Sequence, residues 1–172
     1  MKRTAVIVVV VAALVVLFLL AAPPAVEAQS GSIGLGVALG AAFPAGSTPA
    51  IPSTDGRGSF NWGFYVNIPL IYTFHLTPTA ELYKLAGQNA TDMAIAFKFI
   101  VPLSRLDLYA GLVPGLSAVG DVTAAHVGVL GGASFPLVSN LDLFVQGKYK
   151  WLFQGERNIR VLHANAGILF NF

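Results

Sequence analysis

The sequence predicts an all-β fold, an eight-stranded antiparallel up-and-down transmembrane β-barrel preceded by an N-terminal signal peptide. Apolar and polar side chains alternate along several segments, and the apolar row is the wide one. After residue 28 no run of about 18 apolar residues remains, which excludes helical spanning, although 55% of the chain is apolar and only 10% is charged. Apolar residues at a period of two, with small or polar residues between them, indicate a barrel whose outer face meets lipid.

The first 28 residues have the pattern of a secretory signal peptide. Residues 1–3 are basic at positions 2 and 3, residues 4–22 are apolar, and Val26 and Ala28 provide the small residues of a cleavage site. We therefore expect a signal peptide at 1–28 and one barrel domain at 29–172. An uncleaved anchor is the alternative, because an apolar run of 19 residues is about the minimum for a spanning helix.

Charge and cysteine content exclude several functions. With Lys2, Arg3 and Glu27 set aside, eight basic and seven acidic residues remain, so the net charge of 29–172 is near +1. No basic stripe is present, and we expect no nucleic-acid partner. The chain has no cysteine, which excludes disulfides, thiolate metal sites and cysteine nucleophiles.

The alternation sets the predicted strands. Residues 33–40 carry a bulky outer row against glycine and alanine, and in residues 60–72 outward Phe60, Trp62 and Phe64 alternate with smaller or polar neighbours. The remaining strands are predicted at 76–86, 92–102, 105–116, 125–135, 141–153 and 159–172. The total is even, as expected of bacterial single-chain barrels.

The connections fall into two alternating sets. Those near 74–76, 103–104 and 136–140 are short, whereas 44–59 and 117–124 are longer, and 87–91 and 154–158 are brief but polar. Short turns are typical of the periplasmic end of such barrels and longer loops of the outer end. We therefore expect both mature termini on the periplasmic side.

Strict alternation places a set of polar and charged side chains inside the barrel. Counting back from a loop centred near residues 88 and 89 puts Glu81 opposite Lys98. In the last hairpin the same procedure pairs Lys148 with His163 and Gln146 with Asn165. The predicted lumen network comprises Glu81, Lys98, Asp107, Asp142, Gln146, Lys148, His163 and Asn165.

Two interpretations of this network stay open. A polar conduit with oppositely charged ends could select a small ion. Alternatively, the charges pair with one another and fill the barrel, because about eight strands enclose just enough room for side chains and a buried unpaired charge is costly. The filled barrel is the preferred interpretation.

Catalytic and metal sites are not expected. His126 has Ser117 and Asp121 in the preceding segment, but Ser134 is about 26 Å away at the rise of a strand, so no tight triad emerges. His75 falls in a short turn and His163 in the last strand. No cluster has the spacing of zinc or calcium ligands. We expect that the protein is not an enzyme and that it binds no cofactor and no metal.

Aromatic residues indicate which surroundings the outer face meets. Trp62, Tyr72, Tyr149, Trp151 and Phe170 are predicted to form bands at the two lipid interfaces. A soluble, lipocalin-like ligand barrel would instead need its apolar row inward, and such bands of exposed aromatics argue against it.

The signal peptide, the eight alternating segments, the stretch LDLYAGL at 106–112 and the terminal Phe170, Asn171 and Phe172 together resemble the small bacterial outer-membrane β-barrel family of the OmpA/OmpX type. The resemblance implies an outer-membrane location, contact with outer-membrane lipid, a monomer, and a C-terminal strand ending in Phe172 as the signal to the barrel-assembly machinery. It implies no catalytic residues. The expected function is a structural or surface-interaction role with at most a narrow pore. The alternatives are a small porin-like channel and, with less support, a lipid-modifying enzyme.

Overall fold

The computed structural model describes residues 32–45, 58–85, 87–154 and 157–172, and the predicted signal peptide at 1–28 lies outside these residues. The described residues include no helix that is long and apolar enough to cross a membrane. The strands are β1 (Gly34–Pro44), β2 (Ser59–Ile71), β3 (Phe74–Leu85), β4 (Gln88–Pro102), β5 (Asp107–Leu112), β6 (Gly115–Val119), β7 (Val122–Val138), β8 (Leu141–Gln154) and β9 (Arg157–Asn171).

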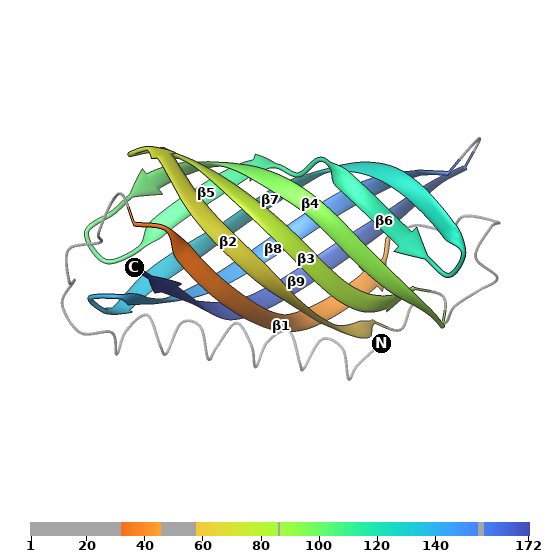
Figure 1. Ribbon diagram of the computed structural model, residues 1–172, viewed down its shortest axis with the longest axis horizontal. Coiled ribbons are helices and arrows are strands. Elements are labelled where there is room, and N and C mark those ends of the chain that lie inside the picture. Colours follow the sequence, from red (N-terminus) through yellow and green to blue (C-terminus); the bar gives the residue numbers. More distant parts are fainter. Residues whose placement is uncertain (1–31, 46–57, 86, 155–156) are drawn as a thin grey trace.

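These strands form one closed antiparallel barrel (Figure 1). β1 pairs with β2 on one side and with β9 on the other, so the first and last strands close the ring. Closure satisfies the backbone groups that an open edge would leave unpaired, which a wall surrounded by hydrocarbon requires. The predicted all-β, antiparallel up-and-down barrel is confirmed.

The fifth position of the barrel is occupied by two short strands instead of one. β5 and β6 both pair with β4 and with β7, and they are separated by Val113 and Pro114. Proline has no N–H to donate, which interrupts the ladder. The Val113 N–H still donates to the Gly128 carbonyl at 2.8 Å, and the Ile95 N–H donates to the Pro114 carbonyl at 3.0 Å. The nine strands therefore make an eight-position barrel.

The large exposed side chains of the wall are apolar, and the buried charged side chains face the lumen. Phe64 is 52% exposed, Ile95 43% and Ile168 45%, whereas Glu81 and His163 are 0% exposed. Burial alternates residue by residue along β4 and β7. The predicted direction of the side chains is confirmed, and it is the reverse of that in a soluble barrel.

Two hairpins at one end are tighter than the sequence suggested. Leu85 pairs with Gln88 across the β3–β4 turn, where Gly87 has φ of 80°, and β6 and β7 meet at Gly120, where φ is 56°. Glycine adopts this left-handed region without a steric cost. The loop predicted at 117–124 is therefore wrong, because its residues belong mostly to paired strands.

The tight β3–β4 turn also changes the predicted register. Glu81 pairs with Asp92, and Lys98 pairs with His75, so the predicted pairing of Glu81 with Lys98 is wrong. The expected pairings of Lys148 with His163 and of Gln146 with Asn165 are confirmed. The difference arises because the β3–β4 hairpin turns at Gly87, before the loop centre expected near residues 88 and 89.

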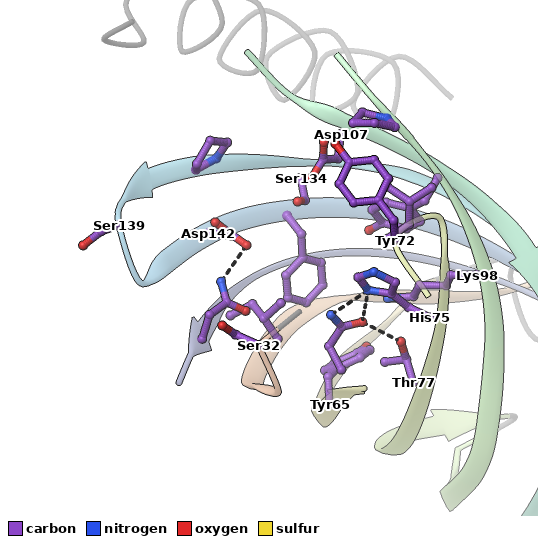
Figure 2. A pocket seen from close by; sticks show the side chains of 18 of the residues that line it. Ser32, Tyr65, Tyr72, His75, Thr77, Lys98, Asp107, Ser134, Ser139 and Asp142 are labelled. Carbon is purple, nitrogen blue, oxygen red and sulfur yellow. Dashed lines mark hydrogen bonds between the residues drawn. The ribbon is translucent and has the colours of Figure 1, made fainter. Parts of the chain in front are cut away.

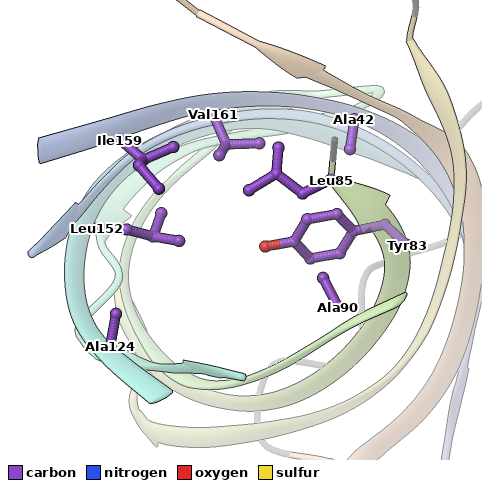
Figure 3. Close-up of a cluster of buried hydrophobic side chains, with 8 residues drawn as sticks. All are labelled: Ala42, Tyr83, Leu85, Ala90, Ala124, Leu152, Ile159 and Val161. Carbon is purple, nitrogen blue, oxygen red and sulfur yellow. The ribbon is translucent and has the colours of Figure 1, made fainter. Parts of the chain in front are cut away.

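The lumen has an apolar layer near the end that holds Gly87 and Gly120. Figure 3 shows its side chains pointing into the ring of strands from several directions. The layer consists of Ala42, Tyr83, Leu85, Ala90, Ala124, Leu152, Ile159 and Val161. Leu152 is 1% exposed and Val161 0%, so this layer fills the barrel cross-section at that level.

Candidate functional site

The middle of the lumen holds two carboxylates and two lysines in direct contact. Glu81 of β3 and Asp92 of β4 lie side by side in the register, and Lys148 and Lys150 reach them from β8. Lys148 Nζ lies 2.6 Å from Glu81 Oε1, and Lys150 Nζ lies 2.5 Å from Asp92 Oδ2 and 3.8 Å from Glu81 Oε2. Two carboxylates on neighbouring strands would repel each other, and the two lysines compensate this repulsion. We call these four residues the ionic cluster.

Polar side chains complete the coordination of Glu81. The Tyr65 hydroxyl donates to Glu81 Oε1, and Asn165 Nδ2 donates to the same oxygen at 2.8 Å. His163 Nδ1 lies 3.6 Å from Glu81 Oε2 and 2.6 Å from Asn61 Nδ2. A buried carboxylate is stabilised by such additional donors. These contacts join β2, β3 and β9 across the lumen.

Asp92 forms a second group with Ser117 and His126. Ser117 Oγ donates to Asp92 Oδ2 at 2.8 Å and lies 3.1 Å from His126 Nδ1, while His126 Nε2 is 3.6 Å from Asp92 Oδ1. The sequence places Asp121 near Ser117 and His126, but the acid beside them in the structure is Asp92. The Ser117 hydroxyl donates its hydrogen bond to Asp92, so His126 does not accept it and is not placed as a base for the serine.

The predicted lumen residues separate into two groups in the structure. Glu81, Lys148, His163 and Asn165 lie in or beside the ionic cluster, and buried Gln146 is next to them in the register. Lys98, Asp107 and Asp142 instead line a cavity nearer the C-terminal end of the chain.

The predicted lumen network does not include Asp92, Tyr65 and Asn61. Each occupies an inward position of its strand by simple alternation, so extending the pattern to every polar residue would have found them.

The cavity lined by Lys98, Asp107 and Asp142 is drawn in Figure 2, and it has a volume of about 100 Å³. His75 Nδ1 lies 3.0 Å from Asn67 Nδ2, and Thr77 Oγ1 donates to Asn67 Oδ1 at 3.0 Å. Asn171 Nδ2 donates to Asp142 at 2.9 Å. Among the described residues, no group of three or more histidine, cysteine or acidic side chains is arranged to hold a metal ion.

The predicted interface aromatics lie on the outer wall with one exception. Trp62 is 39% exposed and Phe170 40%, and Tyr149 packs edge-on against Trp151 with ring centroids 4.8 Å apart. Tyr72, which is 62% exposed, lies in the β2–β3 turn and also borders the cavity. The register of β2 and β3 shifts between Pro69 and Ile71, which changes the alternation before Tyr72 is reached.

Several solved structures have a similar architecture. Neisserial surface protein A (NspA) aligns with a TM-score of 0.65 at 17% identity, covering 81% of this chain and 97% of that one. The chain has the fold of the small outer-membrane β-barrels. A de novo designed transmembrane β-barrel aligns with a TM-score of 0.52 at 16% identity, covering 86% and 100% of the two chains. The outer-membrane enzyme PagL aligns with a TM-score of 0.50 at 12% identity, covering 81% and 99%.

At these identities the similarity of this outer-membrane-type barrel extends to the fold alone. No protein-family model matches the sequence, and no curated protein matches it. The same fold occurs in a surface protein, an enzyme and a designed chain, so the fold does not determine an activity. Function has to be argued from the lumen and the outer wall of this chain.

Proposed function

We propose that this chain is an integral outer-membrane barrel with a structural or surface-interaction role and a lumen closed to solutes. The observation that carries the proposal is the pair of filled layers inside a closed barrel whose outer wall is apolar. A small porin-like channel needs a continuous polar path. The apolar layer and the ionic cluster both lie across that path.

The two layers seal the lumen by different physical means. In the ionic cluster, Lys150 and Asp92 are 0% exposed and hold each other at 2.5 Å, so a permeating ion would have to break buried ion pairs. In the apolar layer, the Tyr83 hydroxyl is the polar group among seven aliphatic side chains (Figure 3), too little to replace the lost water of a hydrated ion. These arrangements support the filled-barrel interpretation over the conduit.

The geometry around Ser117 argues against a hydrolase in the lumen. Ser117 is 0% exposed, and its hydroxyl proton is directed to Asp92. A nucleophile needs both a base and access to substrate. The role of a lipid-modifying enzyme is therefore not part of the proposal. The proposal predicts that lipid A from cells with the chain and from cells without it has the same mass. A mass change that depends on the chain would contradict the proposal.

The location and partners of the barrel belong to the same proposal. We place it in the bacterial outer membrane as a monomer, in contact with lipid and inserted by the barrel-assembly machinery through β9 and Phe172. Both mature termini would be periplasmic, because the longest connection, between β1 and β2, lies at the end of the barrel opposite the C-terminus (Figure 1). The connection from β1 to β2, which includes residues 46–57, would then face the cell surface.

Conductance tests the closed lumen. Folded protein inserted into planar bilayers is expected to give no discrete current steps at several salt concentrations, and insertion is verified by heat-modifiable migration on a gel. A variant with Tyr83→Ala, Leu152→Ala and Lys150→Ala removes side chains from both layers and is expected to conduct. Stable steps from the unaltered chain would contradict the proposal.

Orientation is tested separately. An epitope inserted between residues 46 and 57 is expected to be accessible to antibody on intact cells. Accessibility only after the outer membrane is permeabilised would contradict the proposed direction of the barrel.

A further inference from the structure

The cavity lies at the end of the barrel that holds Asn171 and the β2–β3 and β7–β8 turns, and it is bounded on its inner side by the ionic cluster. Tyr65 connects the two, because it lines the cavity and donates to Glu81. The side chains that line the cavity come from strands around the whole ring (Figure 2). Because the contacts of Glu81 with Tyr65 and Lys148 cross the lumen on its inner side, the cavity is a pocket with a floor and not a section of a pore.

Lys98 is the basic residue of this pocket, and its charge has no acidic partner. The side chain is 9% exposed, and within the described part of the chain it forms no ion pair and donates no hydrogen bond. Its Nζ lies 4.8 Å from the centroid of the Tyr109 ring. Lys148 and Lys150, by contrast, each contact a carboxylate. An ammonium group has three donors, and a buried one is costly unless they are used.

Polar side chains beside Lys98 are held in place by other contacts. His75 is its register partner on β3 and is anchored by Asn67. The Tyr109 hydroxyl donates to the Val145 carbonyl at 3.3 Å, which fixes the ring under the ammonium. A cation on an aromatic face gains part of its lost solvation, but the ring accepts no conventional hydrogen bond from the remaining donors.

The two carboxylates of the pocket do not neutralise Lys98. Asp107 pairs with Pro102, four residues further along β4, which is about 13 Å at the rise of a strand. Asp142 lies on β8 and accepts a hydrogen bond from Asn171. The charge at the inner part of the pocket is therefore positive, and the acidic groups belong to its other walls.

We propose that this pocket binds a small oxyanion on Lys98, through a phosphate or carboxylate group. A volume of about 100 Å³ accommodates an ion of a few heavy atoms. The ammonium donors that have no protein partner would be satisfied by the anion, and the polar groups around His75 line the space beside it. Free phosphate and the phosphate of a lipid headgroup share this chemistry.

The test uses isotope-labelled full barrel folded in maltoside micelles, since phosphocholine detergents carry a phosphate themselves. Inorganic phosphate is titrated at constant ionic strength, with chloride as reference, and amide shifts are followed by NMR. Saturable shifts centred on Lys98, His75 and Tyr109 are expected. A parallel titration with glycerol 3-phosphate distinguishes the sources: comparable binding indicates a headgroup, and binding of inorganic phosphate alone indicates a free anion.

Two variants sharpen the result. Lys98→Met removes the charge and is expected to weaken binding about tenfold or more. Lys84→Met, at an exposed position of β3, is the matched control and is expected to bind like the unaltered chain. Equal binding by both variants would overturn the proposal. If Lys98→Met does not fold, the shift map of the unaltered barrel decides, because absent shifts, or shifts centred on the apolar layer, would overturn it as well.

Discussion

Replacing Lys150 by methionine tests the ionic cluster directly. Lys150 is 0% exposed and lies 2.5 Å from Asp92 and 3.8 Å from Glu81. The four residues of the cluster carry two positive and two negative charges, so Lys150→Met leaves one buried negative charge without compensation. Breaking a buried pair on one side costs about 3 to 5 kcal/mol. Ser117 and His126 still contact Asp92, which favours a value near the lower limit, about 3 kcal/mol.

The assay is urea unfolding of the barrel in lipid vesicles, followed by tryptophan fluorescence and by gel mobility. Asp92→Asn combined with Lys150→Met removes both charges, and the double variant is expected to recover most of the lost stability. Lys84→Met is the matched control, since an exposed lysine should change stability very little. A Lys150→Met barrel as stable as the control would refute the assignment of the ionic cluster as a structural element.

Other perturbations follow from the wall of the barrel. Ile95→Arg, at an outward position near the middle of β4, is expected to cost about 2 to 4 kcal/mol in vesicles, whereas Leu70→Arg near the end of β2 should cost about 1 kcal/mol or less; equal costs in urea titrations would contradict a lipid-facing wall. Gly111→Ala places a methyl group against the Phe97 carbonyl oxygen and is expected to destabilise the barrel by about 1 to 3 kcal/mol. Gly131→Ala is its control, because a Cβ there would have its nearest neighbour at 3.8 Å; a difference too small to measure between the two melting curves would show that the wall yields at Gly111.

Side-chain direction could be read from the sequence because it depends on a local period. In a strand successive residues point to opposite faces, so the alternation along β9 alone places His163 inside and Ile168 outside. The same rule places Lys148 and Lys150 in the lumen on β8. The pairing of the last hairpin could also be predicted, because Lys148 lies opposite His163 as counted.

Register elsewhere could not be read in this way. One glycine at position 87 shortens the β3–β4 turn and moves Glu81 from an expected lysine to Asp92. The shift between Pro69 and Ile71 similarly brings Tyr72 to the cavity. Turn geometry of this kind depends on φ and ψ of single residues, which a period-two pattern does not record.

By itself the sequence determined the class of fold, the number of positions around the barrel and which face of each strand meets the surroundings, because each follows from periodicity and composition along one segment. Only the tertiary structure decided which charges meet. Glu81 is close to Lys148 and Asp92 to Lys150 across the lumen, 67 and 58 residues apart in the chain. Ring closure and the register of every hairpin set those contacts together. Lys98 has no acidic partner because of this register as well. The alternation along β4 alone sets its inward direction, but pairing with other strands sets which residues it meets.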